Sequence, residues 1–450
     1  MNVADREPLL RAFYRAFTGR RAEPLEPTDP LYVPILQSSP GKDPILDLFR
    51  RISWAESESV SLLTGFRGNG KSTELRRLRK LLKEDDCRVI LVDLARYTLL
   101  TKRIELPDLL LGLMVAVTVE IREEAGWDPV AEKLWEPVAH FLGSIQVEGL
   151  SFKAEVFGLG VELATRLSRD PTYKELVQKG LRGHYSSIVR LTNTYMTGLV
   201  EAIRHRSGIK DKKVVILVDS LEQLRGVGDE AEEVQNSVVE LFSGQAANLA
   251  LAQVHMVYTV PPYLLARAPG AARLLGGGTV AVWPNIHVRD REGKDDPTGM
   301  GIMETVVQKR AENWASFLSS EQLHELARST GGDLRDYFRL LRECAIALRN
   351  SEKPTVDAEV LTKVQRQLRQ ELTQLADEDA VWLARVHEKK DTALQKNEDL
   401  PRLIRFLDSN LIMNYLNGEP WYDLHPLILE DVLATAAERA GAPQEGGSPR

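Results

Sequence analysis

Short apolar runs rich in β-branched residues alternate along this chain with longer segments of helical periodicity. A run that is apolar at nearly every position is typical of a strand covered on both faces, and regular alternation with helices is typical of a parallel sheet. The pattern therefore predicts an α/β fold around a parallel five-stranded sheet. The predicted strands are Val60 to Thr64, Arg88 to Asp93, Val214 to Asp219, Val254 to Val260 and Thr279 to Val288.

A long insertion separates the second predicted strand from the third. More than a hundred residues lie between Asp93 and Val214, which is much longer than a normal crossover. Helical patterns cover Trp127 to Leu142 and Tyr173 to His205, whereas residues 145–163 alternate and contain glycines, which predicts a small hairpin. We place this insertion at about residues 126–210.

The chain after the last predicted strand is mostly helical. A charged segment ends near Gly299, and a late helix is followed by two short strands around Asn417-Gly418, a pair that favours a hairpin turn. Helices that end in such a hairpin suggest a winged helix, and the tail after it has too little apolar content to fold. The predicted organisation is an N-terminal extension (1–42), an α/β core (43–297), a helical lid (298–352), a winged-helix-like domain (353–437) and a disordered tail (438–450).

Composition is that of a soluble globular protein. The 450 residues, of which 43% are hydrophobic and 27% charged, suffice for roughly two to four domains. A net charge of -7 argues against a general polyanion binder. The two cysteines, Cys87 and Cys344, lie far apart without neighbouring histidines, so we expect them to have packing roles.

Neither a membrane span nor a signal peptide is predicted. The longest apolar stretch, Leu109 to Val119, is shorter than the roughly 20 residues that a membrane-spanning helix needs, and it predicts a buried helix. The first residues lack the apolar core of a signal peptide. We therefore expect a cytoplasmic protein without membrane contact.

The segment GFRGNGKST, residues 65–73, matches the phosphate-loop pattern G-x-x-x-x-G-K-[ST]. It follows a predicted strand and opens a predicted helix, Lys71 to Leu82, so that backbone N–H groups and the helix N-terminus can surround phosphates. Lys71 is expected to neutralise the β and γ phosphates, and the Ser72 hydroxyl to ligate Mg²⁺. The predicted nucleotide-binding residues of this loop are Gly65, Arg67, Gly68, Asn69, Gly70, Lys71, Ser72 and Thr73.

A phosphate loop requires a carboxylate at the end of a neighbouring strand to hold the metal. Asp219 ends a fully apolar strand and is followed by Glu222, so we assign Asp219 as the Walker B acid and a magnesium ligand. Asp93 is the rival, and we prefer Asp219 because Glu222 supplies a second acid. Ser220 stands where a fast hydrolase usually has glutamate, which leaves Glu222 to polarise water and predicts slow turnover.

Two further residues are candidate sensors of the nucleotide. Thr259 ends a predicted strand, where a hydroxyl can sense the γ-phosphate; the alternative is a strand-end threonine without a ligand. Arg335 follows Gly331-Gly332 at the start of a predicted lid helix, from which it can reach the phosphates; the alternative is an ordinary surface arginine.

The order of these motifs resembles that of AAA+ ATPases, especially the branch of origin recognition ATPases and bacterial STAND signalling ATPases. The segment NYLNGEPWYDLHPLI, residues 414–428, is similar to the winged helix that follows the lid there. The resemblance implies ATP rather than GTP as the nucleotide, and a homo-oligomer. In such an assembly, the resemblance offers Arg267, Arg273 and Arg289 as candidate arginine fingers, and their spacing selects none of them.

Three classes of function compete. The first is a switch in which ATP closes the lid and winged helix onto the core. The second is a DNA-binding ATPase of the origin-loading or transposition-helper kind. The third is an ABC ATPase, suggested by LFSGQ at Leu241 to Gln245; we reject it because the ABC signature precedes the Walker B acid, whereas this segment follows Asp219.

Charge favours the first class over the second. Residues 376–450 carry 8 Lys and Arg against 14 Asp and Glu, which leaves -6. A winged helix that grips DNA neutralises several phosphates with basic side chains, and this one offers mainly Arg402 and Arg405. The basic run Arg76 to Lys83 fits a solvated face of the helix after the loop.

The sequence therefore predicts an ATP-binding, slowly hydrolysing regulatory ATPase. Its nucleotide state is expected to control assembly or activation of a protein partner or effector encoded separately, with Lys71, Asp219 and Glu222 as catalytic residues. A role in antiviral or stress signalling is implied by the STAND resemblance. The alternative is the DNA-binding ATPase, with nucleic acid as partner.

Overall fold

The chain folds into two compact units, each with its own core. The computed structural model describes residues 3–19, 23–36, 43–129, 133–145, 166, 169–226, 228–276, 278–373, 375–417 and 419–441. The sheet unit comprises Pro44–Thr64 and Ser72–Val282. The helical unit comprises Met1–Asp43, Gly65–Lys71 and Trp283–Arg450. The segment before the sheet, expected to be an extension, thus belongs with the lid and the C-terminal helices.

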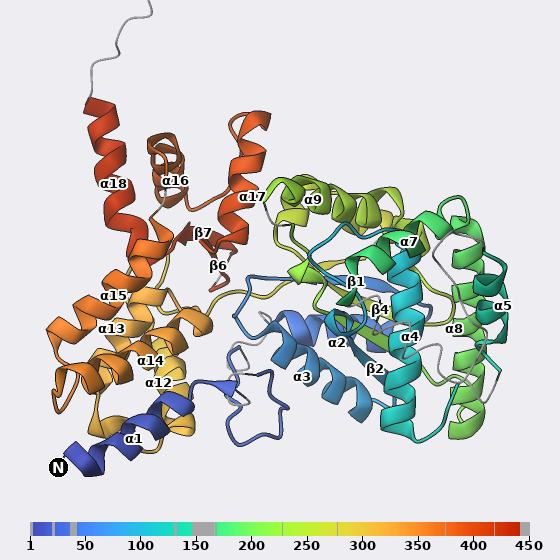
Figure 1. Cartoon of the computed structure of the whole chain (residues 1–450), viewed down its shortest axis with the longest axis horizontal. Coiled ribbons are helices and arrows are strands. Elements are labelled where there is room, and N and C mark those ends of the chain that lie inside the picture. Colours follow the sequence, from blue (N-terminus) through green and yellow to red (C-terminus); the bar gives the residue numbers. More distant parts are fainter. Residues whose placement is uncertain are drawn as a thin grey trace, which may run out of the picture. The chain divides into compact units, whose positions relative to one another are not determined.

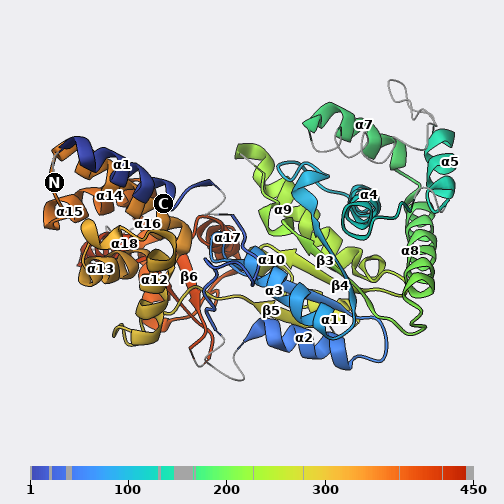
Figure 2. The ribbon, with the colours of Figure 1, turned by 90° about the horizontal axis from the view of Figure 1, so that it is seen from below.

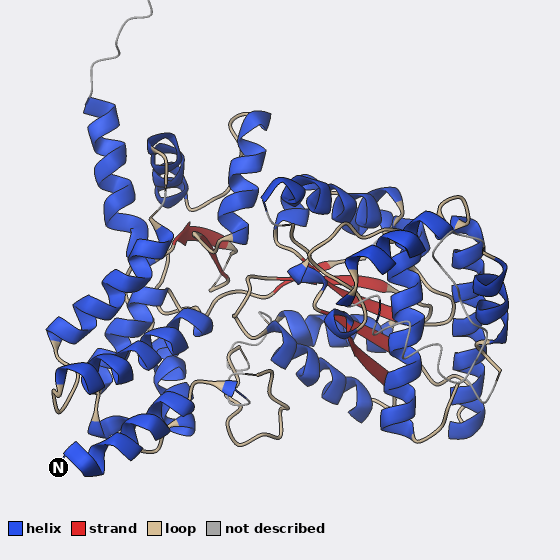
Figure 3. Ribbon diagram, in the orientation of Figure 1, coloured by secondary structure: helices blue, strands red, loops and turns tan. Residues whose placement is uncertain are grey.

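The sheet unit contains five parallel strands in the order β2-β3-β4-β1-β5. All residues of β1, β3 and β4 are buried, as the uniformly apolar runs predict. Figure 3 shows the strands in red between the helices of this unit. Their bounds are β1 Val60–Thr64, β2 Arg88–Asp93, β3 Val214–Asp219, β4 His255–Val260 and β5 Val280–Val282.

The predicted strands are confirmed, except for the length of the last one. The first three have the predicted bounds, and β4 begins one residue late. The prediction of Thr279 to Val288 as one strand is wrong beyond Val282. Pro284 has no N–H to donate to the sheet, and the N–H of Asn285 donates instead to the carbonyl of Asn414 (2.9 Å).

Helices lie on both sides of the sheet; in Figure 2, α2 lies below it and α9 above it. The predicted buried helix at Leu109 to Val119 is confirmed as the centre of α4. The predicted helix from Tyr173 to His205 is two helices, because the chain turns at Gly183, whose φ is 85°. The bounds are α2 Pro44–Trp54, α3 Lys71–Glu84, α4 Leu106–Ala125, α5 Glu136–Ser144, α7 Pro171–Leu181, α8 Tyr185–Ser207, α9 Ala231–Val239, α10 Tyr263–Arg267 and α11 Ala271–Leu274.

Two predictions in the insertion have other outcomes. The helix expected from Trp127 begins only at Glu136, where α5 starts. The hairpin predicted at 145–163 falls on residues 146–163, which lie outside the described part of the chain.

The helical unit buries aromatic side chains from distant segments in one core. Phe13 of α1 packs edge-on against Phe17 and Phe317, with ring centroids 5.2 Å and 5.6 Å apart. Figure 1 shows α1 beside α14, which agrees with this core. The bounds are α1 Val3–Arg15, α12 Pro297–Arg310, α13 Ser320–Thr330, α14 Leu334–Ser351, α15 Ala358–Leu372, α16 Asp377–Lys389, α17 Leu400–Asp408 and α18 Pro426–Gly441.

The predicted C-terminal hairpin is present. Strands β6 (Ile412–Tyr415) and β7 (Trp421–Leu424) are antiparallel, and the last pair before the turn is Tyr415 with Trp421. Asn417 lies in the connection between the two strands, and Gly418 lies outside the described residues. The hairpin follows α16 and α17, the order on which the winged-helix prediction rests; that assignment stays a prediction.

Both cysteines have the predicted packing role, because Cys87 and Cys344 are buried and free. Within the described residues, no helix combines the length and apolar character that a membrane span requires.

Candidate nucleotide-binding site

Three glycines give the phosphate loop its shape. Gly65, Gly68 and Gly70 have φ angles of 155°, 89° and 89°, a region that is accessible to glycine and strained for other residues. Two of them also lack room for a side chain. A Cβ on Gly65 would clash with the carbonyl of Trp283, and a Cβ on Gly68 would lie 2.7 Å from the Cβ of Arg335.

Lys71 is held inside its own loop. Its Nζ donates to the carbonyl oxygens of Gly65 (2.7 Å) and Phe66 (2.6 Å), and the side chain is buried. Two carbonyls of the loop thus orient the Lys71 ammonium. This arrangement suits a cation that must neutralise a bound anion.

Trp283 contacts the loop through a reciprocal pair of hydrogen bonds. Its indole Nε1 donates to the carbonyl of Asn69 (2.9 Å), and the Asn69 Nδ2 donates to the carbonyl of Trp283 (3.0 Å). Both residues are buried. Sequence reasoning missed Trp283, because it lies more than two hundred residues from the loop and inside a predicted strand.

Arg335 lies against the loop, within the same unit. Besides the Cβ contact, its Nε lies 3.1 Å from the position that a Cβ on Gly68 would occupy. The preceding Asp333 accepts from the N–H of Asp336 (3.0 Å) at the start of α14. Burial, together with the nearby charge of Asp336, raises the pKa of Asp333 to about 6.

Asn410, which sequence reasoning also missed, ties the end of α17 to this cluster. Its Nδ2 donates to the carbonyl of Arg67 (3.2 Å) and lies 3.4 Å from the Asp333 carboxylate. No local pattern identifies Asn410, since its role depends on a contact across more than three hundred residues.

The glycines before Arg335 bring the turn between α13 and α14 close to two other segments. A Cβ on Gly332 would clash with the carbonyl of Ile286, and one on Gly331 would lie 2.7 Å from the Tyr415 hydroxyl. That hydroxyl donates to the Gly331 carbonyl (2.8 Å). The Gly331-Gly332 pair is therefore required for packing between α13, the hairpin and the segment after β5.

Asp219, the predicted magnesium ligand, lies in the sheet unit at the end of β3. It accepts hydrogen bonds from the Ser72 hydroxyl and from the N–H of Ser220 (2.9 Å). Burial and, to a smaller extent, the neighbouring Glu222 raise the pKa of Asp219 to about 7, and the hydrogen bond from Ser72 opposes both effects. A hydroxyl and a carboxylate already in contact fit Mg²⁺, which takes one or two protein ligands and fills its remaining positions with phosphate and water.

Glu222 is nearly buried, and one of its oxygens, Oε2, has no hydrogen-bond partner. The turn that carries it is fixed by the neighbouring strand, because the N–H of Leu221 donates to the hydroxyl of Thr259 (3.2 Å). Thr259 is fully buried. Its shown role is thus to hold the turn, whereas sensing of the γ-phosphate stays a prediction.

Asp93, the rival acid, lies beside Asp219 in the register of the sheet. Its Oδ1 accepts from the Ser220 hydroxyl (2.6 Å) and from the N–H of Ala95 (3.2 Å). Ser220 has a φ of 74°, which is strained for serine. Asp93 therefore stabilises the strained turn after β3. Among the described residues, no three His, Cys, Asp or Glu side chains gather into a metal-binding group.

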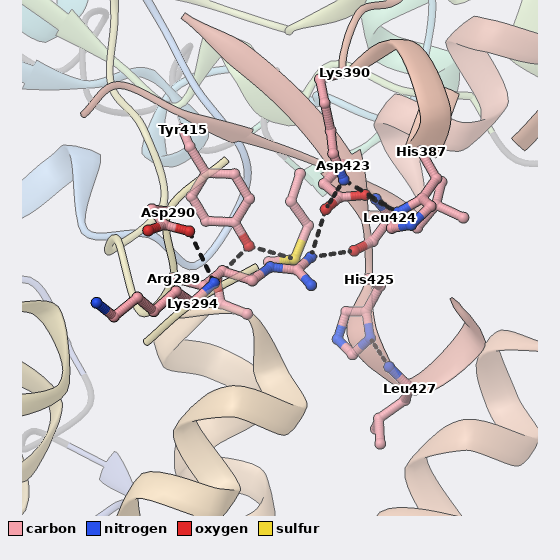
Figure 4. A network of polar contacts seen from close by, with 12 residues as sticks. Arg289, Asp290, Lys294, His387, Lys390, Tyr415, Asp423, Leu424, His425 and Leu427 are labelled. Carbon is pink, nitrogen blue, oxygen red and sulfur yellow. Dashed lines mark hydrogen bonds and ion pairs between the residues drawn. The ribbon is translucent and has the colours of Figure 1, made fainter. Parts of the chain in front are cut away.

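One of the three candidate arginine fingers, Arg289, is held by contacts with the hairpin. Arg289 pairs with Asp423 (3.1 Å) and donates to the carbonyl of Leu424 (3.1 Å), as Figure 4 shows. This makes Arg289 a poor arginine finger. Arg267 is half-buried and Arg273 is exposed.

Several side chains of the basic run on α3 form ion pairs. Arg77 pairs with Glu74 (2.5 Å), and Arg79 and Lys83 pair with Glu124 (2.8 Å and 3.4 Å). The run is therefore not wholly a solvated face, because Arg77 is buried.

Comparisons with known proteins find similar solved structures at low sequence identity. No protein-family description matches the chain, and no curated protein matches it. Solved structures that resemble it include the Aeropyrum pernix ORC2 protein in its ADP form, at 11% identity and a TM-score of 0.40, over 95% of this chain and 98% of that one. Cdc6p from Pyrobaculum aerophilum matches at 13% identity and 0.37, over 94% and 98%. Thermotoga maritima RuvB matches at 12% and 0.35, over 90% and 92%.

Proposed function

We propose that this chain is an ATP-binding, slowly hydrolysing P-loop ATPase of the AAA+ type. The observation that carries the proposal is the loop at residues 65–71, in which three glycines adopt positive φ angles and Lys71 is oriented by loop carbonyls. Backbone N–H groups in such a loop, together with the N-terminus of α3, bind phosphate.

The proposed division of labour follows from the contacts. Lys71 binds the β and γ phosphates, and Ser72 with Asp219 holds Mg²⁺, which neutralises charge on the phosphates. Glu222 uses its unpaired Oε2 to accept a proton from the attacking water. Its placement three residues after Asp219, with Ser220 occupied by Asp93, supports slow turnover.

Nucleotide state is proposed to control the helical unit through Arg335. Its side chain contacts Gly68, and a γ-phosphate at the loop would add an attractive partner for the guanidinium. A ligand shifts a conformational equilibrium only by its differential affinity for the two states. Arg335 provides that difference, and assembly or partner activation is the proposed readout.

A DNA-binding ATPase is the second candidate. The similar structures include origin recognition, Cdc6 and RuvB proteins, and one of them is Drosophila ORC bound to DNA. Against DNA contact through α17 stands Asp379, which pairs with both Arg402 (3.0 Å) and Arg405. The antiviral or stress-signalling role rests on the STAND resemblance alone, as does a separately encoded effector.

Molecular mass in solution tests the proposal. Wild type, Lys71→Ala and the control Lys80→Ala are compared with ATP, ADP and no nucleotide, each with Mg²⁺. Lys80 lies on α3 outside the loop and is exposed. We expect an ATP-dependent change of mass or of partner recovery that Lys80→Ala keeps and Lys71→Ala loses. Equal behaviour in all nucleotide states would contradict the switch, and salt-sensitive duplex binding would support the second candidate.

A further inference from the structure

The residues after β5 run from the phosphate loop to the C-terminal hairpin. We call residues 283–289 the connecting segment. At its first residue lies the reciprocal pair of Trp283 and Asn69 described above. The carbonyl of Trp283 also approaches Gly65 so closely that no Cβ fits there. Trp283 thus restricts the conformation of the loop at both Gly65 and Asn69.

The other end of the segment follows the hairpin, at every second residue. The N–H of Asn285 donates to the carbonyl of Asn414 (2.9 Å), and the N–H of Leu416 donates to Nε2 of His287 (3.0 Å). Asn285 and His287 thus attach the connecting segment to the hairpin at Asn414 and Leu416.

Arg289 completes this attachment. In Figure 4 its guanidinium lies between Tyr415 and Asp423, within reach of the Leu424 carbonyl. Asp423 also accepts from His387 (2.7 Å) and Lys390 (2.8 Å) on the α16 side. The hairpin end is therefore anchored by several charged hydrogen bonds, whereas the loop end depends on the Trp283 contacts.

We propose that Trp283 is a positioning residue for the phosphate loop and that the connecting segment couples the loop to the hairpin. The inference rests on the proposed function, because it assumes that the loop binds ATP. Trp283 holds the carbonyl of Asn69 and with it the orientation of the peptide unit between Asn69 and Gly70. Any shift of the loop on binding then moves the segment on which Asn414 and Leu416 depend.

Trp283→Phe tests the first half. It removes the Nε1 donor and keeps an aromatic ring, so the carbonyl of Asn69 loses its partner. A buried hydrogen bond lost in this way weakens binding by about tenfold. We expect KM for ATP to rise by about tenfold while kcat changes by less than about threefold. A loop that holds phosphate equally in the ground state and in the transition state contributes uniform binding, which affects KM and not kcat.

Trp135→Phe is the matched control. Its Nε1 donates to Thr118 (2.7 Å) at an equally buried place in the sheet unit. Both variants lose one indole hydrogen bond and are expected to lose similar stability. Only Trp283→Phe should weaken ATP binding, and an equal effect of the two variants would overturn the positioning role.

Asn69→Ala provides the second variant and keeps the test valid if Trp283→Phe does not fold. It removes the other hydrogen bond of the pair. If the two bonds act as a unit, the double variant Asn69→Ala/Trp283→Phe should bind ATP about as weakly as either single variant. Independent, multiplying effects would contradict the pair.

Amide hydrogen exchange tests the coupling. The N–H groups of Asn285 and Leu416 report the contacts between segment and hairpin. We expect ATP to change their exchange rates in wild type and Trp135→Phe but not in Trp283→Phe. If ATP changes these exchange rates in Trp283→Phe as it does in wild type, the proposed coupling is wrong. Absence of ATP binding by the wild type would overturn the proposed function as well, which separates the two failures.

Discussion

Glu222 and Gly68 show how single residues define this site. Glu222 is nearly buried beside Asp219 and has an oxygen without a partner, an arrangement that costs stability unless a ligand or water uses it. Gly68 combines a positive φ with direct contact to Arg335. Glu222 is thus proposed to act in catalysis and Gly68 to contact Arg335, and each role can be tested separately.

Glu222→Gln is expected to lower kcat by about 10² or more, the usual contribution of a general base. The affinity for ATP should stay within a few fold, because Gln keeps the size and one oxygen. Single-turnover hydrolysis and calorimetric binding check this. The exposed Glu232→Gln on α9 is the control, and full activity of Glu222→Gln would show that another group activates water.

Gly68→Ala and Gly70→Ala separate backbone strain from the contact with Arg335. Both residues have a φ of 89°, but only Gly68 has a neighbour at 2.7 Å; Gly70 has nothing within 4 Å of an added Cβ. Each variant should lose about 1–2 kcal/mol of unfolding free energy from strain. Gly68→Ala should lose more, measured by denaturant titration without nucleotide. Equal losses would mean that Arg335 does not rest on Gly68 in solution.

At the scale of elements, buried polar groups fix how helices begin and dock. Asp108, at the start of α4, accepts from the N–H of Glu105 (3.0 Å) and from Gln178 (2.5 Å) on the same oxygen, Oδ2. Its other oxygen has no partner. Burial raises the pKa of Asp108 to about 6, and the charge of Lys174 only partly opposes this. Thus α7 docks on α4 at the cost of one destabilised carboxylate.

Asp108→Asn should remove a pH dependence of stability. The pKa of Asp108 rises from 3.8 in the unfolded chain to about 6 in the folded one, so the folded state holds the proton more tightly. Its contribution is present below pH 4 and is lost as pH rises toward 6. Relative to the variant, the wild type should lose on the order of 3 kcal/mol between pH 4 and 7. Denaturant titrations at several pH values check the sign, and a difference that grows the other way would refute the buried state.

At the scale of the whole molecule, charge and organisation limit the partners. The chain has a net charge of -7. Basic side chains on α3 and α17 that could contact nucleic acid form ion pairs with acidic side chains of the chain itself. Each unit has its own buried core, so each is expected to keep its own fold.

Replacement of Arg402 and Arg405 by alanine tests whether α17 contacts DNA. Both guanidinium groups are bound to Asp379, which is buried. The double variant should lose stability, because Asp379 is left without its cations, and should leave duplex affinity unchanged. Fluorescence anisotropy at 50 mM and 200 mM salt checks this. A weaker affinity with a shallower salt dependence would instead place α17 on DNA.

The sequence by itself determined what depends on neighbouring residues. The bounds of β1, β2 and β3 follow from uninterrupted apolar runs, because such runs are stable only when covered on both faces. The spacing of Gly65, Gly70 and Lys71 likewise encodes a local backbone path that needs no distant contact. The roles of the site residues are still predictions.

Only the tertiary structure decided which distant side chains reach the loop. Trp283 and Asn410 carry no motif, and hydrogen bonds to Asn69 and Arg67 assign them to the site. The local pattern also predicted too long a strand after Gly278, because the N–H of Asn285 donates to the hairpin and not to the sheet. Long-range hydrogen bonds depend on chain segments meeting in space, and periodicity contains no information about which segments meet.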